Sequence, residues 1–107
     1  MLKANFITAQ EAAEKIQDGS TLCTIGMTLV SASESILKAI EKRFETVGHP
    51  ADITLVHSCG QSDRKDGIQH LAHEGLVKRI VGSHWGLQPR WMEMIANSQV
   101  EAYCLPQ

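Results

Sequence analysis

Two short stretches carry side chains whose types and spacing could do chemistry. In the first, His70 and His73 would lie one turn apart on a helix, where two histidines can hold a metal ion. The spacing differs from that of zinc proteases, which place two histidines four residues apart with a glutamate between them, and no cysteine or further histidine stands at a matching distance. A partly exposed helix face therefore explains the pair better, and we expect no metal site.

The second stretch is Gly82-Ser83-His84-Trp85-Gly86, where two glycines frame a titratable and an aromatic residue. His84 could act as an acid, a base or a hydrogen-bond donor. The same pattern fits either a structural loop or the wall of a ligand pocket. Sequence signatures of serine hydrolases, P-loop NTPases and dinucleotide-binding enzymes are absent from the chain.

The element that must position such residues is a strand, loop and helix between residues 18 and 44. Residues 21–25 are apolar and β-branched, which predicts a strand that ends at Gly26. A loop of small residues follows, and Ser31 and Glu34 have the spacing of a capping box at the start of a helix. Ligands in parallel α/β sheets gather at the carboxyl ends of strands, although an ordinary connection without a ligand fits this stretch as well.

The rest of the chain repeats the alternation of strand and helix. Further strands are predicted at residues 53–57, 77–81 and 100–105, and helices at 8–19, 36–48, 68–74 and from Pro89 onward. This order predicts an α/β fold in which a parallel sheet is flanked by helices, with one unit covering residues 1–107. Because the chain stops directly after a strand, we expect an incomplete domain, either truncated or completed by another chain.

Composition limits the class of protein. The chain has 107 residues, of which 43% are hydrophobic and 21% charged, which is typical of a soluble globular protein. A net charge of −2 argues against nucleic acid or an anionic membrane as partners. No run of apolar residues reaches the length of a membrane span, and the start lacks the pattern of a signal peptide. We expect a cytoplasmic protein in which Cys23, Cys59 and Cys104 are buried, reduced thiols.

Several segments together resemble a known family. Residues 70–79 (HLAHEGLVKR), 82–86 (GSHWG) and 101–107 (EAYCLPQ) resemble the N-terminal part of family I CoA-transferases, closest to the long single-chain acetate, propionate and acetoacetate type. Residues 7–13 and the Gly48-His49-Pro50 sequence before the second strand agree with the same family. The resemblance runs in consistent order through nearly all of the chain.

The resemblance implies a fold of the CoA-transferase or NagB-RpiA type and a ping-pong exchange of CoA between carboxylic acids. In this family a glutamate of the C-terminal half attacks an acyl-CoA thioester and becomes a glutamyl-CoA thioester. No residue here matches that glutamate, since Glu11, Glu34 and Glu74 occupy helical, capping or helix-end positions. Coenzyme A would be a substrate, with no separate cofactor, and the expected partners are acyl-CoA, a short-chain carboxylate, the missing half or a partner subunit, and further copies of the chain.

The resemblance also implies one wall of a substrate site. Its predicted substrate-binding residues are Gly26, Met27, Ser31, Ser83, His84 and Gln107. The family's loop after the first strand usually carries Gly-Gly-Phe and later Gly-x-Pro, whereas residues 25–27 here are Ile-Gly-Met and residues 31–33 are Ser-Ala-Ser. A non-catalytic binding or assembly subunit and an inactive fragment remain alternatives to a working transferase.

Overall fold

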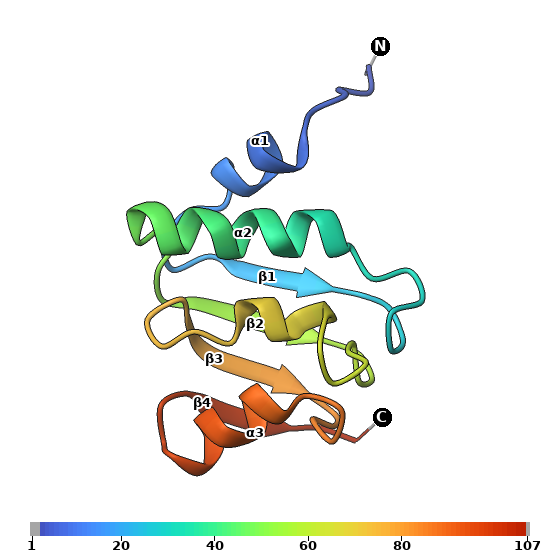
Figure 1. The fold of residues 1–107 in the computed structure, drawn as a ribbon, viewed down its shortest axis with the longest axis vertical. Helices are drawn as coiled ribbons and strands as arrows, with labels where there is room; N and C mark the ends of the chain where they lie inside the picture. Colours follow the sequence, from blue (N-terminus) through green and yellow to red (C-terminus); the bar gives the residue numbers. More distant parts are fainter. Residues whose placement is uncertain (1–2, 107) are drawn as a thin grey trace.

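The computed structural model describes residues 3–106, which form one parallel sheet with helices packed against it (Figure 1). The strands are β1 (Thr21–Thr24), β2 (Ile53–His57), β3 (Val77–Gly82) and β4 (Glu101–Cys104). The helices are α1 (Ala9–Glu14), α2 (Glu34–Val47), the 3₁₀ helix η1 (Gly67–Leu71) and α3 (Pro89–Ala96). The predicted α/β class and the order of its elements are confirmed.

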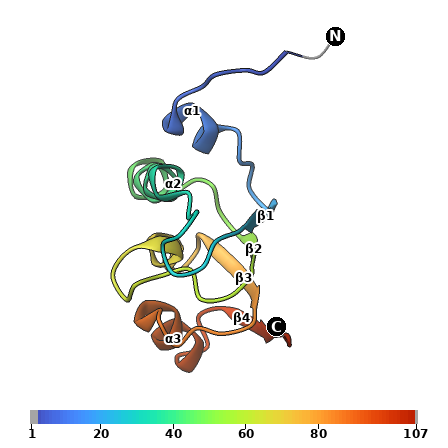
Figure 2. The same cartoon turned by 90° about the vertical axis from the view of Figure 1, so that its right-hand side faces the viewer.

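Strand order explains the shape of the molecule. The sheet runs β1-β2-β3-β4, so each strand pairs in parallel with the strand that precedes it in sequence. A right-handed crossover that always steps in the same direction places every connecting helix on the same face. Figure 2 shows this arrangement, with the helices on one side of the sheet and no described element on the other.

The core lies between the sheet and its helices. Ile53 and Leu55 of β2 and Ile80 of β3 point toward the helices and have no solvent-exposed surface. Leu37 and Ile40 of α2 meet them, as does Trp91 of α3, whose indole N–H donates to the carbonyl of Ile68 at 2.9 Å. The alternating side chains of β2 and the periodic stripe of α2 therefore bury the two apolar faces that the sequence predicts.

The opposite face of the sheet, here called the open face, carries side chains that no described element covers. One row across it is Cys23, Val56, Val81 and Tyr103, which are partners in the strand register. Val56 and Val81 are half-buried, whereas Cys23 and Tyr103 are exposed. An apolar row of this kind on one face of a sheet is typical of a surface that packs against another layer.

The sequence predicts two of the four ends of α1 and α2 correctly, the start of α1 and the end of α2. The capping box of Thr8 and Glu11 is present, and Gly48 ends α2 in the left-handed conformation with φ 73°. However, α1 ends at Glu14 rather than near Gly19. The predicted capping box at Ser31 is wrong, because the N-cap is Ser33 and makes no side-chain hydrogen bond, while Ser31 takes a positive φ of 62° within the preceding turn.

Two further predictions need correction. The helix predicted at residues 68–74 is the shorter 3₁₀ helix η1, because the backbone leaves the helical region at Ala72 with ψ 70°. Cys23 and Cys104 are free thiols as expected, but both are exposed, and Cys59 is only half-buried, so the predicted burial of the three cysteines is wrong. Cys23 and Cys104 lie on the two edge strands, where little of the chain covers them. Among residues 3–106, no helix has the length and apolar character needed to cross a bilayer.

The open face generates a prediction about association. We expect the chain at micromolar concentration to sediment as a species larger than a monomer, because the open face and two unpaired sheet edges favour contact with another chain. Tyr103→Glu, which places a charge on that face, should shift the distribution toward the monomer. Met92→Glu is the matched control, since Met92 is 52% exposed on α3 and Tyr103 is 51% exposed. A wild-type monomer with cooperative melting would contradict the prediction.

Candidate functional site

The carboxyl ends of the strands form the candidate site. The loops that follow β1, β2 and β3 meet there with the segment after β4, which continues the pairing through a hydrogen bond from the amide of Leu105 to the carbonyl of Gly82 (2.8 Å). A cavity of about 230 Å³ opens at this edge and is lined by residues 56–59, 81–83 and 105–106. Since Val56 and Val81 belong to the open face, the cavity lies where that face meets the loops.

Ser83 contributes a hydroxyl group to the cavity lining. Its Oγ is buried and has no hydrogen-bond partner among the described residues. A buried hydroxyl without a partner is costly, so such a group is available to a ligand that can accept or donate. The carbonyl of Ser83 is already used, because it accepts from the thiol of Cys104 at 3.3 Å.

His84 follows directly but does not line the cavity. Its ring is exposed, and Nδ1 accepts from the backbone amide of Gly86 at 2.9 Å. In the neutral ring this bond places the proton on Nε2. That nitrogen lies over Gly60, where an added Cβ would stand 2.7 Å away.

The loop between β1 and α2 (residues 25–33), here called the ridge, lies apart from the lining of the cavity. Met27 and Val30 exchange backbone hydrogen bonds of 3.1 and 2.8 Å, which closes a tight turn. Gly26 enters this turn with φ 143°, and a Cβ there would lie only 2.9 Å from the carbonyl oxygen of Val30. Met27 and Ser31 are exposed. The predicted residues Gly26, Met27 and Ser31 therefore lie together, but none of them lines the cavity.

Gly60 joins the two groups of predicted residues, although it was not itself predicted as a site residue. Its carbonyl accepts from the amide of Thr28 at 2.7 Å, so it holds the ridge after β1. Its other side is covered by the ring of His84, which leaves no room for a side chain. A glycine in a polar loop directly after a buried strand was the available signal. The remaining predicted residue, Gln107, lies outside the described part of the chain.

The imidazole of His57 is hydrogen-bonded to the loop that follows β2 and to the loop that follows β3. It is 5% exposed, its Nδ1–H donates to the carbonyl of Cys59 at 2.9 Å, and its Nε2 accepts from the indole N–H of Trp85 at 2.9 Å. This pair of bonds requires the neutral ring. Burial lowers the pKa of His57, and this effect outweighs the hydrogen bonds to the Cys59 and Ser58 carbonyls, which act in the opposite direction. His57 was predicted only as the end of a strand.

Two buried glutamines complete the frame. The amide nitrogen of Gln61 donates to the carbonyl of Thr24 at 2.9 Å and to that of Ser58 at 3.1 Å. The side-chain amide of Gln88, in the orientation that satisfies both bonds, donates to the carbonyl of Trp85 at 3.0 Å. Its oxygen accepts from the backbone N–H of Gln61, also at 3.0 Å. The ends of β1, β2 and β3 are thus linked by neutral polar side chains, which fix loop positions without adding charge.

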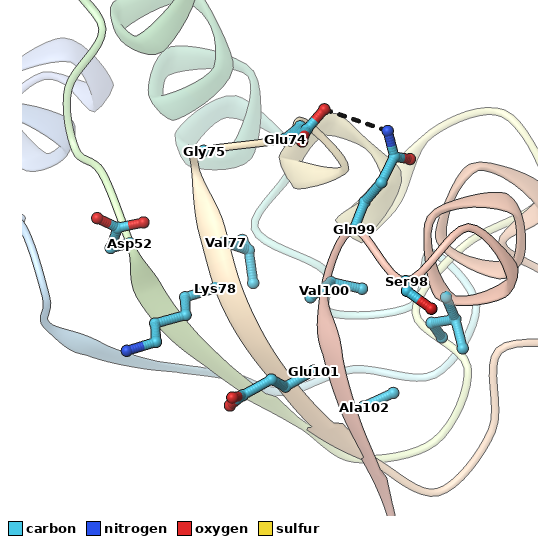
Figure 3. A pocket seen from close by; sticks show the side chains of 11 residues that line it. Asp52, Glu74, Gly75, Val77, Lys78, Ser98, Gln99, Val100, Glu101 and Ala102 are labelled. Atoms are coloured by element: carbon cyan, nitrogen blue, oxygen red, sulfur yellow. Dashed lines mark hydrogen bonds between the residues drawn. The ribbon is translucent and has the colours of Figure 1, made fainter.

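The three glutamates considered as nucleophiles lie away from the cavity. Glu11 belongs to the capping box of α1, and Glu34 accepts from the amide of Gly67 at 3.0 Å and contacts His70. Glu74 accepts from Gln99 at 3.1 Å at the amino ends of the strands, beside a groove of about 630 Å³ (Figure 3). The charged residues around this groove are three acids and one base, which disfavours anionic ligands. They are Asp52, Glu74, Lys78 and Glu101.

Comparison with known proteins relates the chain to a group of transferases. The profile of a family described as coenzyme A transferase matches residues 6–107. Caffeate CoA-transferase of Acetobacterium woodii is 35% identical over 105 residues, which is 97% of this chain and 20% of that protein. Acetate CoA-transferase YdiF of Escherichia coli K12 is 34% identical over 94% of this chain and 19% of its own length.

Solved structures agree with the sequence comparison. A crystal structure of the acyl-CoA transferase YdiF from Escherichia coli O157:H7, in a thioester complex with CoA, superposes with a TM-score of 0.87. The two sequences are 32% identical, and the match covers 94% of this chain and 21% of that one. The chain therefore spans about a fifth of the length of the curated relatives it matches.

The crowding at Gly26 leads to a prediction about stability. Gly26→Ala should lower the free energy of unfolding by more than Gly19→Ala does. A side chain at a left-handed position costs about 1–2 kcal/mol. The clash with the carbonyl of Val30 adds an overpacking cost of roughly 1–3 kcal/mol. Gly19 is the matched control because it also has a positive φ, 73°, but has no atom within 4 Å of an added Cβ. Equal urea midpoints for the two variants would contradict this prediction.

The neutral state of His57 leads to a prediction about pH. Because burial lowers its pKa, the unfolded chain binds more protons than the folded one below the ordinary histidine value of about 6.5. Stability is therefore full above that pH and falls as the pH drops toward the lowered value. His57→Gln, which can still donate to Cys59 and accept from Trp85, should show a flatter dependence of Tm on pH.

The matched control for this prediction is His49→Gln. The side chain of His49 is 53% exposed, and its replacement leaves the buried imidazole of His57 in place, so the acid-induced loss of stability should remain. Melting curves between about pH 7.5 and 5 measure the effect. An unchanged slope in His57→Gln would mean that other groups cause the acid sensitivity.

Proposed function

Since the chain belongs to the coenzyme A transferase family, we propose that it supplies one wall of the site at which CoA is exchanged between a short-chain acyl-CoA and a carboxylic acid. The carboxylate nucleophile comes from outside these residues. The observation that carries the proposal is the family match over residues 6–107, which includes every described loop at the carboxyl edge of the sheet. We further propose that the protein works in the cytoplasm.

The proposed reaction proceeds in two balanced steps. A glutamate carboxylate attacks the thioester carbonyl, and the C–S bond breaks to release the CoA thiolate. The thiolate then attacks the glutamyl carbonyl of the resulting anhydride, so that the acyl group leaves as a carboxylate with one glutamate oxygen and a glutamyl-CoA thioester remains. A second carboxylic acid then takes the CoA and restores the glutamate. In each step negative charge develops on an oxygen atom of the reacting carbonyl group. Hydrogen-bond donors held at a fixed distance stabilise that charge.

The cavity at the carboxyl edge suits the small end of such a substrate. Its volume of about 230 Å³ is below the ~300–1,000 Å³ of pockets for drug-sized ligands, which favours a short acyl chain. Val56 and Val81 offer apolar contact, and the hydroxyl of Ser83 can bond a carboxylate or thioester oxygen. The exposed His84, with its Nε2 proton, can serve as a second donor at the rim.

Two rivals share the same fold. In one, the chain is a binding or assembly subunit that completes a larger enzyme but contacts no substrate. In the other, it is an inactive fragment, an interpretation favoured by the replacement of the family's Gly-Gly-Phe with Ile25-Gly26-Met27. The structure weakens one part of that argument, because Ile25 is not among the residues with positive φ and so avoids the strain expected for a β-branched residue.

Activity assays provide the test. The tag-free chain, incubated with acetyl-CoA and propionate, should form no propionyl-CoA, because none of its described glutamates lines the cavity. Mixing it with the remaining portion of a relative such as YdiF should restore turnover. In that mixture Ser83→Ala should lower kcat/KM about tenfold, which corresponds to the loss of one hydrogen bond of about 1–1.5 kcal/mol. Ser98→Ala, at the amino edge, is the control.

The outcomes separate the three interpretations. Turnover by the chain alone that disappears in Glu11→Gln, Glu34→Gln or Glu74→Gln would overturn the proposal. Restored turnover that Ser83→Ala leaves unchanged would favour the assembly subunit. Failure to bind the added portion at all would favour the inactive fragment.

A further inference from the structure

A cluster of histidines and carboxylates lies where α2 packs against η1, apart from the cavity. Glu34 and Glu41 come from α2, Asp66 precedes η1, and His70 and His73 lie at its end and just beyond it. The side chain of His70 is only 12% exposed, and those of the three acids are 19–33% exposed. The two histidines are partly exposed, as the sequence predicts, and both face carboxylates of α2.

Both ring nitrogens of His70 face carboxylate oxygens. Nδ1 lies 3.0 Å from Oε1 of Glu41 and can donate its proton there. Nε2 contacts Oε1 of Glu34 and lies 3.5 Å from Oδ1 of Asp66. In metal sites a carboxylate commonly holds one nitrogen of a histidine while the other nitrogen binds the ion, and Glu41 is placed to hold Nδ1 in this way.

Little positive charge from the protein reaches the Nε2 side. Apart from His70 itself, Lys38 is the one basic residue among the described ion pairs that approaches Glu34, at 4.0 Å, and its side chain is 59% exposed. Arg90 instead approaches Glu41, at 3.5 Å, and its guanidinium lies 3.1 Å from Nε2 of His73. Two carboxylates thus converge on the Nε2 of His70, and apart from that imidazole no buried basic group of the described residues pairs with them.

We propose that Glu34, Asp66 and His70 bind a divalent cation of the zinc class. Their ligand atoms lie within 4.8 Å of one another, so small side-chain rotations bring them to the bond lengths of about 2.0–2.2 Å that zinc requires. One nitrogen and two carboxylate oxygens suit zinc better than magnesium or calcium, which prefer oxygen alone. Water would complete the coordination.

The neighbouring group of Glu41, Glu45 and His73 also has ligand atoms within 4.8 Å of one another, but it does not carry a second site. The guanidinium of Arg90 already lies against His73 and Glu41, and a second cation there would be repelled. Glu41 instead acts as the outer partner that orients the ring of His70.

The site connects the loops of the carboxyl edge. Glu34 is the first residue of α2, directly after the loop that follows β1, and Asp66 ends the loop that follows β2. Glu34 also accepts from the amide of Gly67 at 3.0 Å. A bound ion would therefore fix the far ends of both loops to η1. This role does not depend on the proposed transferase function.

Titration with ZnCl₂ at neutral pH tests the proposal. The tag-free chain should bind one equivalent of zinc in calorimetry and melt at a higher temperature, whereas MgCl₂ should have no effect. Asp66→Asn removes one ligand while its side chain keeps its shape, and it should weaken binding by about tenfold or more. Glu93→Gln, which removes an exposed carboxylate on α3, should bind as the wild type does.

Cobalt(II) provides a second measurement that needs no variant. Its absorption spectrum should be that of a nitrogen and oxygen site, without the charge-transfer band of a thiolate ligand. A thiolate band would place the ion on a cysteine and overturn the proposal. It would also be overturned if the wild type bound no zinc, or if a folded Asp66→Asn variant bound zinc as tightly as the wild type.

Discussion

The structure depends on one constraint, the right-handed crossover between neighbouring parallel strands. Because the strands follow one another across the sheet in sequence order, each crossover adds its helix to the same face. The same constraint brings the loops that follow the strands together at one edge of the sheet. It also leaves the row from Cys23 to Tyr103 without a covering layer in the described part of the chain. The core, the candidate site and the open face are thus three results of a single topological rule.

Neutral hydrogen bonds, rather than ion pairs, hold the parts of the loops that lie around the cavity. His57, Gln61 and Gln88 are buried there and bond mainly to backbone carbonyls and amides. Charged pairs lie elsewhere, between α2 and η1 and between β3 and β4. The proposed acyl-CoA site would benefit from this division, because rigid dipoles stabilise developing negative charge without competing counter-ions.

The sequence predicted the elements well and the site only in part. Apolar periodicity identified β2 at its observed bounds, and Gly48 and Pro89 marked the end of α2 and the start of α3. Periodicity could not reveal that Gly60 lies between Thr28 and His84, since that contact joins three separate loops. The link from His70 to Glu34 and Glu41 was equally hidden, because it depends on how α2 packs over η1. Local patterns report local structure, whereas these sites come from tertiary contacts.

The sequential strand order has a consequence for how the fold is built during synthesis. Every strand pairs with the one made just before it, so each unit of strand and helix can dock onto units that have already left the ribosome. Each pairing joins strands that are neighbours in the sequence, which keeps the connections to be closed as short as a parallel sheet allows. The sheet can therefore grow in one direction during synthesis, because each newly made strand becomes the edge strand with which the next strand pairs.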